Sequence, residues 1–454
     1  MPLASVNPAS NRVLQTFPAW DAQRLHEALE KARSAQQAWA QTDFAVRRGV
    51  LRGVAARLQS RHDRYGALIT MEMGKLLREA RAEVEKCAFA CDYFAQHAEH
   101  FLSPETVESD AGRSYVAYYP LGVVLAVMPW NFPFWQVIRA AAPTLMAGNA
   151  VVLKHASSVP QCALALESLF RECGLPEGVF TALLIESGQV GDVIASPNVD
   201  AVTLTGSEAT GRKVAAAAGQ HLKKCVLELG GSDPFIVLQD ADLELAAATA
   251  VTARFQNCGQ SCIAAKRFIV VPQVADEFVE RLKARLEVLR PGDPLDEGTQ
   301  LAPMARADLR ELLHRQVTES VAEGAVAVTG CEPEPGPGFY YRASILDRVT
   351  QNMRAYREEL FGPVAAVIRA SNEEMALRIA NETRYGLGSS IWARDAERAE
   401  RLAARIQAGS TFVNGLVKSD PRLPFGGVKA SGYGRELSRM GILEFVNAKT
   451  VWIR

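Results

Sequence analysis

The segment GVVLAVMPWNFPFWQVIRAAAPTLMAGNAVVLK, residues 122–154, decides the class of fold. Two short valine-rich runs flank a longer apolar stretch in it. Similar β-rich runs follow at 201–206, 225–229 and 235–238, and a helix is expected at 160–173, ended by Gly174. This alternation is typical of a mostly parallel α/β sheet.

A second alternation of the same kind begins near Asp233. Helices are expected at 243–255, 275–289, 308–323 and 373–381, with strands such as RFIVV and STFVN between or after them. The first hundred residues predict helices instead, with Asp21 as an N-cap. Because a chain of 454 residues is longer than a single hydrophobic core usually supports, we expect two α/β domains. The segment CEPEPGPG, residues 331–338, is expected to be a surface loop within the second domain.

Composition argues against several classes of function. The formal net charge of -1 provides no global field for nucleic acid, so no nucleic-acid partner is expected. The start, MPLASVNPAS, lacks the features of a leader peptide, and the longest apolar stretch, Leu121 to Trp135, is too short to cross a bilayer. We expect a cytoplasmic protein without a membrane partner, whose eight cysteines are reduced.

Cys87 and Cys91 are four residues apart, with His97 nearby. Helical spacing could place both thiols on one face as metal ligands, yet no complementary Cys/His pair completes a set of four. The favoured interpretation is small apolar residues in a helix, and no metal is expected.

Three segments carry residues suited to catalysis. In FQNCGQSC (255–262), Cys262 follows a glycine-containing turn after a helix, where its thiol could attack a carbonyl carbon. In VLELGGSDP (226–234), Glu228 ends a β-rich run, the usual place for catalytic groups in an open sheet. In MPWNFPFWQVIR (128–139), the Asn131 amide could donate to a developing oxyanion. Each residue alone also fits a structural role: a buried small side chain, a solvated strand end or a satisfied turn.

Together these segments resemble the aldehyde dehydrogenase superfamily. MPWNFP, LTGSEATG, LELGG, FQNCGQSC, EELFGPV and PFGGVKASGYGRE occur in its order and approximate spacing, over essentially the whole chain. The resemblance implies two Rossmann-like open-sheet domains, one binding the cofactor (1–101, 121–230 and 431–445) and one catalytic (231–430). It also implies a small β oligomerisation element (102–120 and 446–454), with SYVAYYPLGVV hairpin-like, in a homodimer or homotetramer.

The resemblance assigns catalytic roles. Cys262 becomes the nucleophile, Glu228 the general base, and Asn131 with the Cys262 backbone N–H the oxyanion hole. An aldehyde would be oxidised through a thiohemiacetal and a thioester, which water activated by Glu228 hydrolyses. Members that pass the acyl group to coenzyme A typically lack this acid, so Glu228 favours hydrolysis.

The implied cofactor is NAD or NADP. No G-x-G-x-x-G fingerprint is present, but Gly206 and Ser207 lie at a strand-to-helix turn whose N–H groups can meet a diphosphate. The remaining cofactor residues implied by the family are Lys154 at the adenosine ribose, Glu359 and Phe361 at the nicotinamide ribose, and Trp130 in the cleft wall. Ser157 stands where NAD-preferring relatives often carry a glutamate. Because serine does not repel a 2′-phosphate, NADP should be tolerated, and the choice stays open.

Arg139 resembles an arginine that binds the far carboxylate of the substrate in succinate semialdehyde dehydrogenases. A second family arginine is here Gln256, which weakens a two-arginine clamp. Ser419 could supply the missing hydrogen bond, and Lys418 or Arg254 some charge. Strings such as KKCVLELGGSDPFIVL resemble the bacterial NAD(P)-dependent branch, so the expected reaction is oxidation of succinate semialdehyde.

Alternatives stay open at this point. Glutarate semialdehyde, a neutral aliphatic aldehyde or a betaine-type aldehyde could be the substrate, although Arg139 argues against a cationic one. A catalytically silent NAD-binding protein is the alternative from another class, and an esterase side activity of Cys262 is compatible with the same residues. Cys258 could cap an oxidised Cys262 as a disulfide, or it could be a packing residue.

Overall fold

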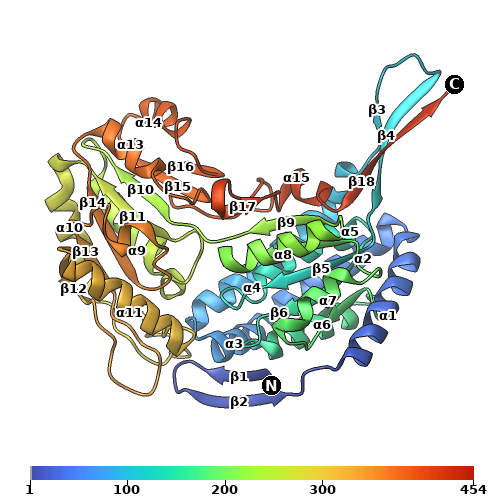
Figure 1. The fold of residues 1–454 in the computed structure, drawn as a ribbon, viewed down its shortest axis with the longest axis horizontal. Helices are drawn as coiled ribbons and strands as arrows, with labels where there is room; N and C mark the ends of the chain where they lie inside the picture. The colour runs from blue at the N-terminus through green and yellow to red at the C-terminus, as the bar shows by residue number, and fades with distance from the viewer. Residues whose placement is uncertain (1–2) are drawn as a thin grey trace.

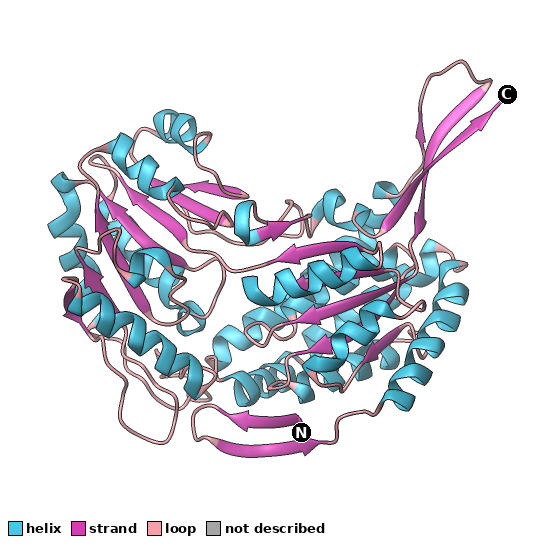
Figure 2. Ribbon diagram, viewed as in Figure 1, coloured by secondary structure: helices cyan, strands magenta, loops and turns pink. Residues whose placement is uncertain are grey.

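The computed structural model describes residues 3–454, so the first two residues of the expected cofactor-binding domain lie outside the described part. Within this part, the strands form a seven-stranded, a six-stranded and a three-stranded sheet and a two-stranded hairpin. Figures 1 and 2 show helices around the two large sheets, and the three-stranded sheet projecting from the body of the molecule. The expected α/β fold is confirmed.

The six-stranded sheet is parallel except at one edge. In sheet order its strands are β17 (Gly432–Tyr433), β9 (Lys224–Glu228), β8 (Ala201–Thr205), β5 (Val123–Met128), β6 (Ala150–His155) and β7 (Phe180–Ala182). Only β17 runs antiparallel to its neighbour. Every residue of β6 and β8 is buried, as expected for parallel strands covered by helices on both faces.

Helices from three parts of the chain accompany this sheet. They are α1 (Ala22–Ala40), α2 (Phe44–Ser60), α3 (His62–Met73), α4 (Leu77–Phe101), α5 (Trp135–Met146), α6 (Pro160–Glu172), α7 (Val190–Ala195), α8 (Glu208–Gln220) and α15 (Ser438–Leu443), with 3-10 turns η1 (Ser187–Gln189) and η3 (Lys429–Ser431). The N-cap prediction is confirmed, since the Asp21 side chain accepts from the Arg24 N–H at 2.8 Å. Gly174 follows the end of α6 with a φ of 88°, the left-handed value that ends many helices.

The expectation of helices from the first residues onward is wrong. Residues 3–17 form an antiparallel hairpin of β1 (Leu3–Asn7) and β2 (Arg12–Phe17). Pro8 cannot continue a helix, and Asn11 takes a φ of 54° in the turn, where it donates its N–H to the Asn7 carbonyl at 2.8 Å.

The seven-stranded sheet belongs to the second half of the chain. In order its strands are β12 (Val326–Thr329), β13 (Ser344–Asp347), β14 (Val364–Arg369), β11 (Ala265–Val270), β10 (Asp233–Val237), β15 (Gly388–Trp392) and β16 (Ser410–Val413), all parallel but β12. Its helices are α9 (Leu243–Phe255), α10 (Pro272–Leu286), α11 (Ala307–Ala322), α12 (Arg354–Arg357), α13 (Glu373–Asn381) and α14 (Ala396–Ala403), with the 3-10 turn η2 (Gln256–Gly259). All four helices expected here are confirmed, and residues 331–338 are a loop between β12 and β13 of one sheet.

The projecting sheet joins distant parts of the chain. It consists of β18 (Val446–Ile453), β4 (Arg113–Pro120) and β3 (Glu105–Thr106), all antiparallel. The expectation of a hairpin in SYVAYYPLGVV is wrong, because β4 and β5 lie in different sheets. The turn is anchored to the body instead: Gly122 donates its N–H to Asn149 Oδ1 at 2.8 Å, and Val123 to Asp200 Oδ2 at 2.7 Å.

The strand order gathers the predicted site residues at one edge. Because β5, β6, β8 and β9 are parallel neighbours, their carboxyl ends lie together. Asn131 follows β5, Lys154 is near the end of β6, Gly206 follows β8, and Glu228 ends β9. Among the described helices, none has the length and apolar composition that crossing a membrane requires.

Candidate active site

Cys262, a partly exposed residue, lies in the turn between η2 and β11. Asn257 and Cys258 have left-handed φ values of 55° and 53°, which reverse the chain after α9. From beneath, Lys266 Nζ donates to the carbonyl oxygens of Ser261 at 2.8 Å and Cys262 at 2.7 Å. The loop is therefore held through its backbone, which leaves the thiol side open.

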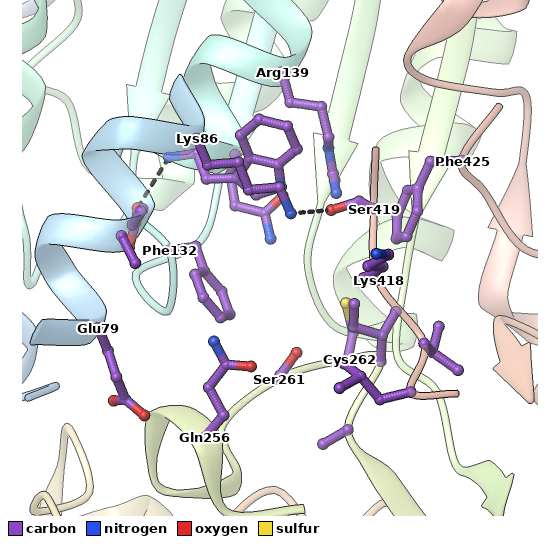
Figure 3. Close-up of a pocket in the computed structure, with 18 of the residues that line it drawn as sticks. Glu79, Lys86, Phe132, Arg139, Gln256, Ser261, Cys262, Lys418, Ser419 and Phe425 are labelled. Carbon is purple, nitrogen blue, oxygen red and sulfur yellow. Dashed lines mark hydrogen bonds between the residues drawn. The ribbon is translucent and has the colours of Figure 1, made fainter. Parts of the chain in front are cut away.

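A cavity of about 200 Å³ opens beside this cysteine (Figure 3). Helices α4 and α5 contribute Lys86 and Arg139, and the loop after β16 contributes Lys418 and Ser419. In Figure 3 the polar ends of Lys86, Arg139 and Ser419 gather on one side, with Cys262 across from them. The lining also includes Glu79, Phe132, Trp135, Gln256 and Phe425.

Arg254 does not reach this cavity. Its side chain is fully buried and donates to the carbonyl oxygens of Val364 and Leu360, both at 2.7 Å. The expectation that Arg254 supplies charge to the substrate is wrong, since its guanidinium anchors the loop before β14.

Arg139 is buried and already has a carboxylate partner. Its Nε forms an ion pair with Glu436, and its guanidinium carbon lies 4.6 Å from the centre of the Phe425 ring. An N–H of Arg139 also donates to Thr205 Oγ1 at 3.3 Å. The sequence did not indicate this pairing, although Glu436 is the last residue of the motif PFGGVKASGYGRE.

Glu228 is buried next to that pair. Its side chain is 2% exposed, and neither carboxylate oxygen has a hydrogen-bond partner in the described part of the chain. Burial, reinforced by the negative charge of Glu436, raises the pKa of Glu228 well above its usual range, and Arg139 only partly opposes this. The protonated form of this carboxyl is therefore favoured relative to that of an exposed glutamate.

Asn131 is buried between the cavity wall and the cysteine loop. Its amide nitrogen donates to the Gln260 carbonyl at 3.0 Å, and because an amide carries two N–H groups, a second remains for a ligand. Asn257 ties the two loops together by donating to the carbonyl of Asn131 at 2.9 Å. Asn131 and Glu228 do not themselves line the cavity of Figure 3.

The thiols differ in surroundings. Burial raises the pKa of Cys262 to about 12, while the charges of Lys266 and Arg139 act in the opposite direction. Cys258 is 1% exposed and packs in the apolar cluster of the seven-stranded sheet, which favours its packing interpretation. The disulfide with Cys262 stays a prediction. Cys87 and Cys91 are fully buried in α4, and residues 3–454 contain no group of three or more His, Cys, Asp and Glu placed to hold a metal.

The predicted cofactor residues form three groups. Around the cleft, Trp130 meets the Phe361 ring edge-on at 5.9 Å, and Glu359 accepts from the Gly231 N–H at 3.1 Å. At the end of β6, the buried Lys154 ammonium lies 3.5 Å from Ser157 Oγ, and no acid in the described residues pairs with it. Burial lowers the pKa of Lys154. A buried ammonium without a counter-charge fits a phosphorylated ligand.

The N-terminus of α8 lies at the same sheet edge. Ser207 is the exposed N-cap of this helix, and its side chain accepts from the Thr210 N–H at 3.3 Å. Gly206, between β8 and this cap, has no side chain to obstruct an approaching diphosphate. These residues fit the dinucleotide that the sequence implies.

A model of the aldehyde dehydrogenase family matches residues 1–451. The chain belongs to the aldehyde dehydrogenase family. This aldehyde dehydrogenase is 50% identical over 453 residues to a probable NADP(+) succinate-semialdehyde dehydrogenase of Synechocystis, covering 100% of both chains. It is 48% identical over 456 residues to succinate-semialdehyde dehydrogenase [NADP(+)] 1 of Mycobacterium tuberculosis, again covering 100% of both.

A solved structure agrees with these relatives. Succinic semialdehyde dehydrogenase from Streptococcus pyogenes, in complex with NADP+ as the cofactor, superimposes with a TM-score of 0.98 at 40% identity, covering 99% of each chain. The resemblance to bacterial succinate semialdehyde dehydrogenases and the Rossmann-like fold that it implied are confirmed.

Proposed function

We propose that this aldehyde dehydrogenase oxidises succinate semialdehyde to succinate with NADP as its cofactor. The observation that carries the proposal is the cavity in which Cys262 lies across from Arg139 and Ser419. A short aldehyde there can present its carbonyl to the thiol and its carboxylate to the cationic side. The names of the relatives from Synechocystis and Mycobacterium tuberculosis support the same substrate.

In the first half of the reaction, Cys262 Sγ bonds to the aldehyde carbon. The free N–H of the Asn131 amide and the Cys262 backbone N–H stabilise the oxyanion of the thiohemiacetal. Because burial raises the thiol pKa, the positive charges of Lys266 and Arg139 are needed to favour the reactive thiolate. A bound nicotinamide would supply the acceptor for the hydride of this carbon, and loss of that hydride would leave a thioester on Cys262.

In the second half, Glu228 removes a proton from water. The water oxygen bonds to the thioester carbon, the C–S bond breaks, and the sulfur takes up a proton as succinate leaves. Glu228 can act as a base only in its ionised form, so its raised pKa makes this step faster at higher pH.

The cofactor choice rests on Lys154 and Ser157. The uncompensated Lys154 ammonium can bind a 2′-phosphate, and the exposed Ser157 hydroxyl can donate to it. A glutamate at position 157 would repel that phosphate.

We further propose the division into a cofactor-binding domain (1–101, 121–230 and 431–445), a catalytic domain (231–430) and an oligomerisation element (102–120 and 446–454). The projecting sheet supports assembly into a dimer or a tetramer of dimers, because Tyr119, Trp452 and Ile453 are 48%, 50% and 45% exposed on it. Light scattering on the protein and on a Trp452→Lys variant tests this assembly. The cytoplasmic location stays a prediction.

The substrate and cofactor are tested in one experiment. The purified protein is supplied with NADP or NAD and with succinate semialdehyde, glutarate semialdehyde, propanal or betaine aldehyde, and the absorbance of the reduced nicotinamide is followed. We expect the highest kcat/KM with succinate semialdehyde and NADP. A higher value with propanal would contradict the substrate, and a higher value with NAD would contradict the cofactor.

A further inference from the structure

Lys86 is a cation of the cavity wall that no motif indicated. It lies on α4, and its Nζ donates to Oγ of Ser419, a residue of the loop after β16, at 2.7 Å (Figure 3). The same ammonium lies 4.2 Å from the centre of the Trp135 ring, which is 3% exposed. Two contacts from different elements therefore fix the position of a charge that a lysine side chain otherwise leaves mobile.

Glu83 and Asp420, the two acids whose charges act on Lys86, both form ion pairs with other cations. Glu83, three residues before it on α4, forms a buried ion pair with Lys75 at 2.6 Å. Asp420 pairs with Arg422, also at 2.6 Å. In the described residues no carboxylate lies within ion-pair distance of Lys86, whereas Arg139 forms an ion pair with Glu436. Among the described residues, Lys86 and Lys418 are therefore the cavity-lining cations without an ion-pair partner, and Lys86 is the one that donates to Ser419.

The hydrogen bond to Ser419 has a direction that matters. Since the ammonium is the donor, Ser419 Oγ accepts, and its own O–H is left to donate to a second acceptor. An ammonium has three N–H groups, so Lys86 retains donors as well. Together, the two side chains present two adjacent donors, which match the two oxygens of one carboxylate.

We propose that Lys86, with Ser419, binds the carboxylate of the aldehyde substrate and sets the specificity for carboxylated over neutral aldehydes. This inference rests on the proposed function and names the residue that selects its substrate. Position 256, where the family resemblance implies a second arginine, carries a neutral glutamine. Lys86 supplies the second cation instead, from the helix α4. Arg139 remains beside it as a paired charge that shapes the pocket.

The selectivity for carboxylated aldehydes should depend on pH, because Lys86 ionises. Burial, followed by the positive charge of Arg139, lowers the pKa of Lys86 to about 8. Glu83 and Cys87 on α4 and Asp420 on the loop after β16 act in the opposite direction, and Glu79 and Lys418 also face the cavity. A lowered lysine pKa means that the cation is present at neutral pH and is lost as the pH rises through about 8.

The test compares each carboxylated aldehyde with a neutral aldehyde of the same length: succinate semialdehyde with butanal, and glutarate semialdehyde with pentanal. In Lys86→Met we expect the ratio of kcat/KM within a pair to fall by about 10- to 100-fold, the loss of one charge-assisted hydrogen bond. A structural role would lower both members of a pair alike and leave the ratio unchanged, which overturns the inference. Lys31→Met, which removes an exposed lysine of α1 paired with Glu177, is the control.

Lys86→Arg supplies the second readout. Arginine stays protonated, so the ratio should be retained and should no longer decline as the pH passes about 8, as it does in the wild type. The same decline in Lys86→Arg would overturn the inference. The wild type could instead prefer glutarate semialdehyde over succinate semialdehyde. If Lys86→Met then lowers the ratio of kcat/KM for glutarate semialdehyde over pentanal, the substrate proposal fails and the role of Lys86 stands. If the wild type prefers neither carboxylated aldehyde over its neutral partner, both fail.

Discussion

Lys266 connects Cys262 to the loop that carries Glu359: its Nζ donates to the Cys262 carbonyl at 2.7 Å and pairs with Glu359 Oε1 at 3.2 Å. The lysine is 1% exposed, so both contacts are shielded from water. A change at Glu359, the predicted contact of the nicotinamide ribose, can therefore reach Cys262, the predicted nucleophile, through a single ammonium.

Replacing Lys266 by methionine should slow alkylation of Cys262 by iodoacetamide and raise the KM for NADP. The first effect follows because Lys266 opposes the burial that raises the thiol pKa, and the second because Glu359 loses its partner. Alkylation rates at several pH values measure the first effect. Lys429→Met, which removes a lysine bonded to the carbonyls of Asn381 and Thr383, is the control, and an unchanged rate in Lys266→Met would contradict the prediction.

Glu228→Gln should separate the two halves of the reaction. Steady-state turnover is expected to fall by about 100-fold or more, because no base activates water, while the first turnover still reduces cofactor. Rapid mixing should show a burst of reduced nicotinamide that matches the concentration of active sites. If the burst is lost together with turnover, Glu228 acts before the thioester forms, which would contradict the prediction.

The same substitution should change the pH dependence of stability. The folded-state pKa of Glu228 is raised, so the stability it contributes is present below the unfolded pKa and is lost as the pH rises through the folded pKa. Glutamine cannot ionise, and we expect Glu228→Gln to melt at a higher temperature than the wild type, by a margin that grows toward alkaline pH. A margin that shrinks with rising pH would show that the buried carboxyl is already ionised.

The buried pair of Arg139 and Glu436 should be far more sensitive to single than to double substitution. Arg139→Met leaves Glu436 buried without its cation, at a cost of about 3–5 kcal/mol of unfolding free energy. In Arg139→Met/Glu436→Gln most of this loss should be recovered, as denaturant titration of both proteins would reveal. Substrate selectivity is then measured on the double variant, where folding no longer obscures it.

Ser157→Glu should turn the cofactor preference toward NAD. The new carboxylate would lie beside Lys154, neutralise its ammonium and repel a 2′-phosphate. We expect the KM for NADP to rise by at least about tenfold, the equivalent of one charge-assisted contact, while the KM for NAD changes less. Ser157→Ala controls for loss of the hydroxyl alone, and retained NADP preference in Ser157→Glu would remove this position from the phosphate site.

Local sequence signals predicted what depends on neighbours along the chain. The β-rich runs, the helix of Glu373–Asn381, the cap at Asp21 and the turn before Cys262 are all encoded by residues close together in the chain. The family resemblance added the cavity residues Arg139 and Ser419. The ion pair of Arg139 with Glu436 and the contact of Lys86 with Ser419 join residues hundreds of positions apart, and no periodicity in a single sequence reports such contacts.

The errors have equally physical causes. Arg254 lies in the last turn of the apolar helix α9, where a local pattern suggests an available charge, but its guanidinium donates to the distant backbone carbonyls of Leu360 and Val364. SYVAYYPLGVV has the strand propensity of a hairpin, yet side chains of Asn149 and Asp200 capture its turn and send the two strands to different sheets.

The projecting sheet cannot form until the end of the chain has been synthesised. Strand β18 pairs with β4 along its whole length, yet the entire chain from Leu121 to Phe445 must be translated between them. At about 5–20 residues per second, β4 waits on the order of tens of seconds for its partner. During synthesis its aromatic edge is unprotected, so newly made chains should depend on chaperones at this strand before any other.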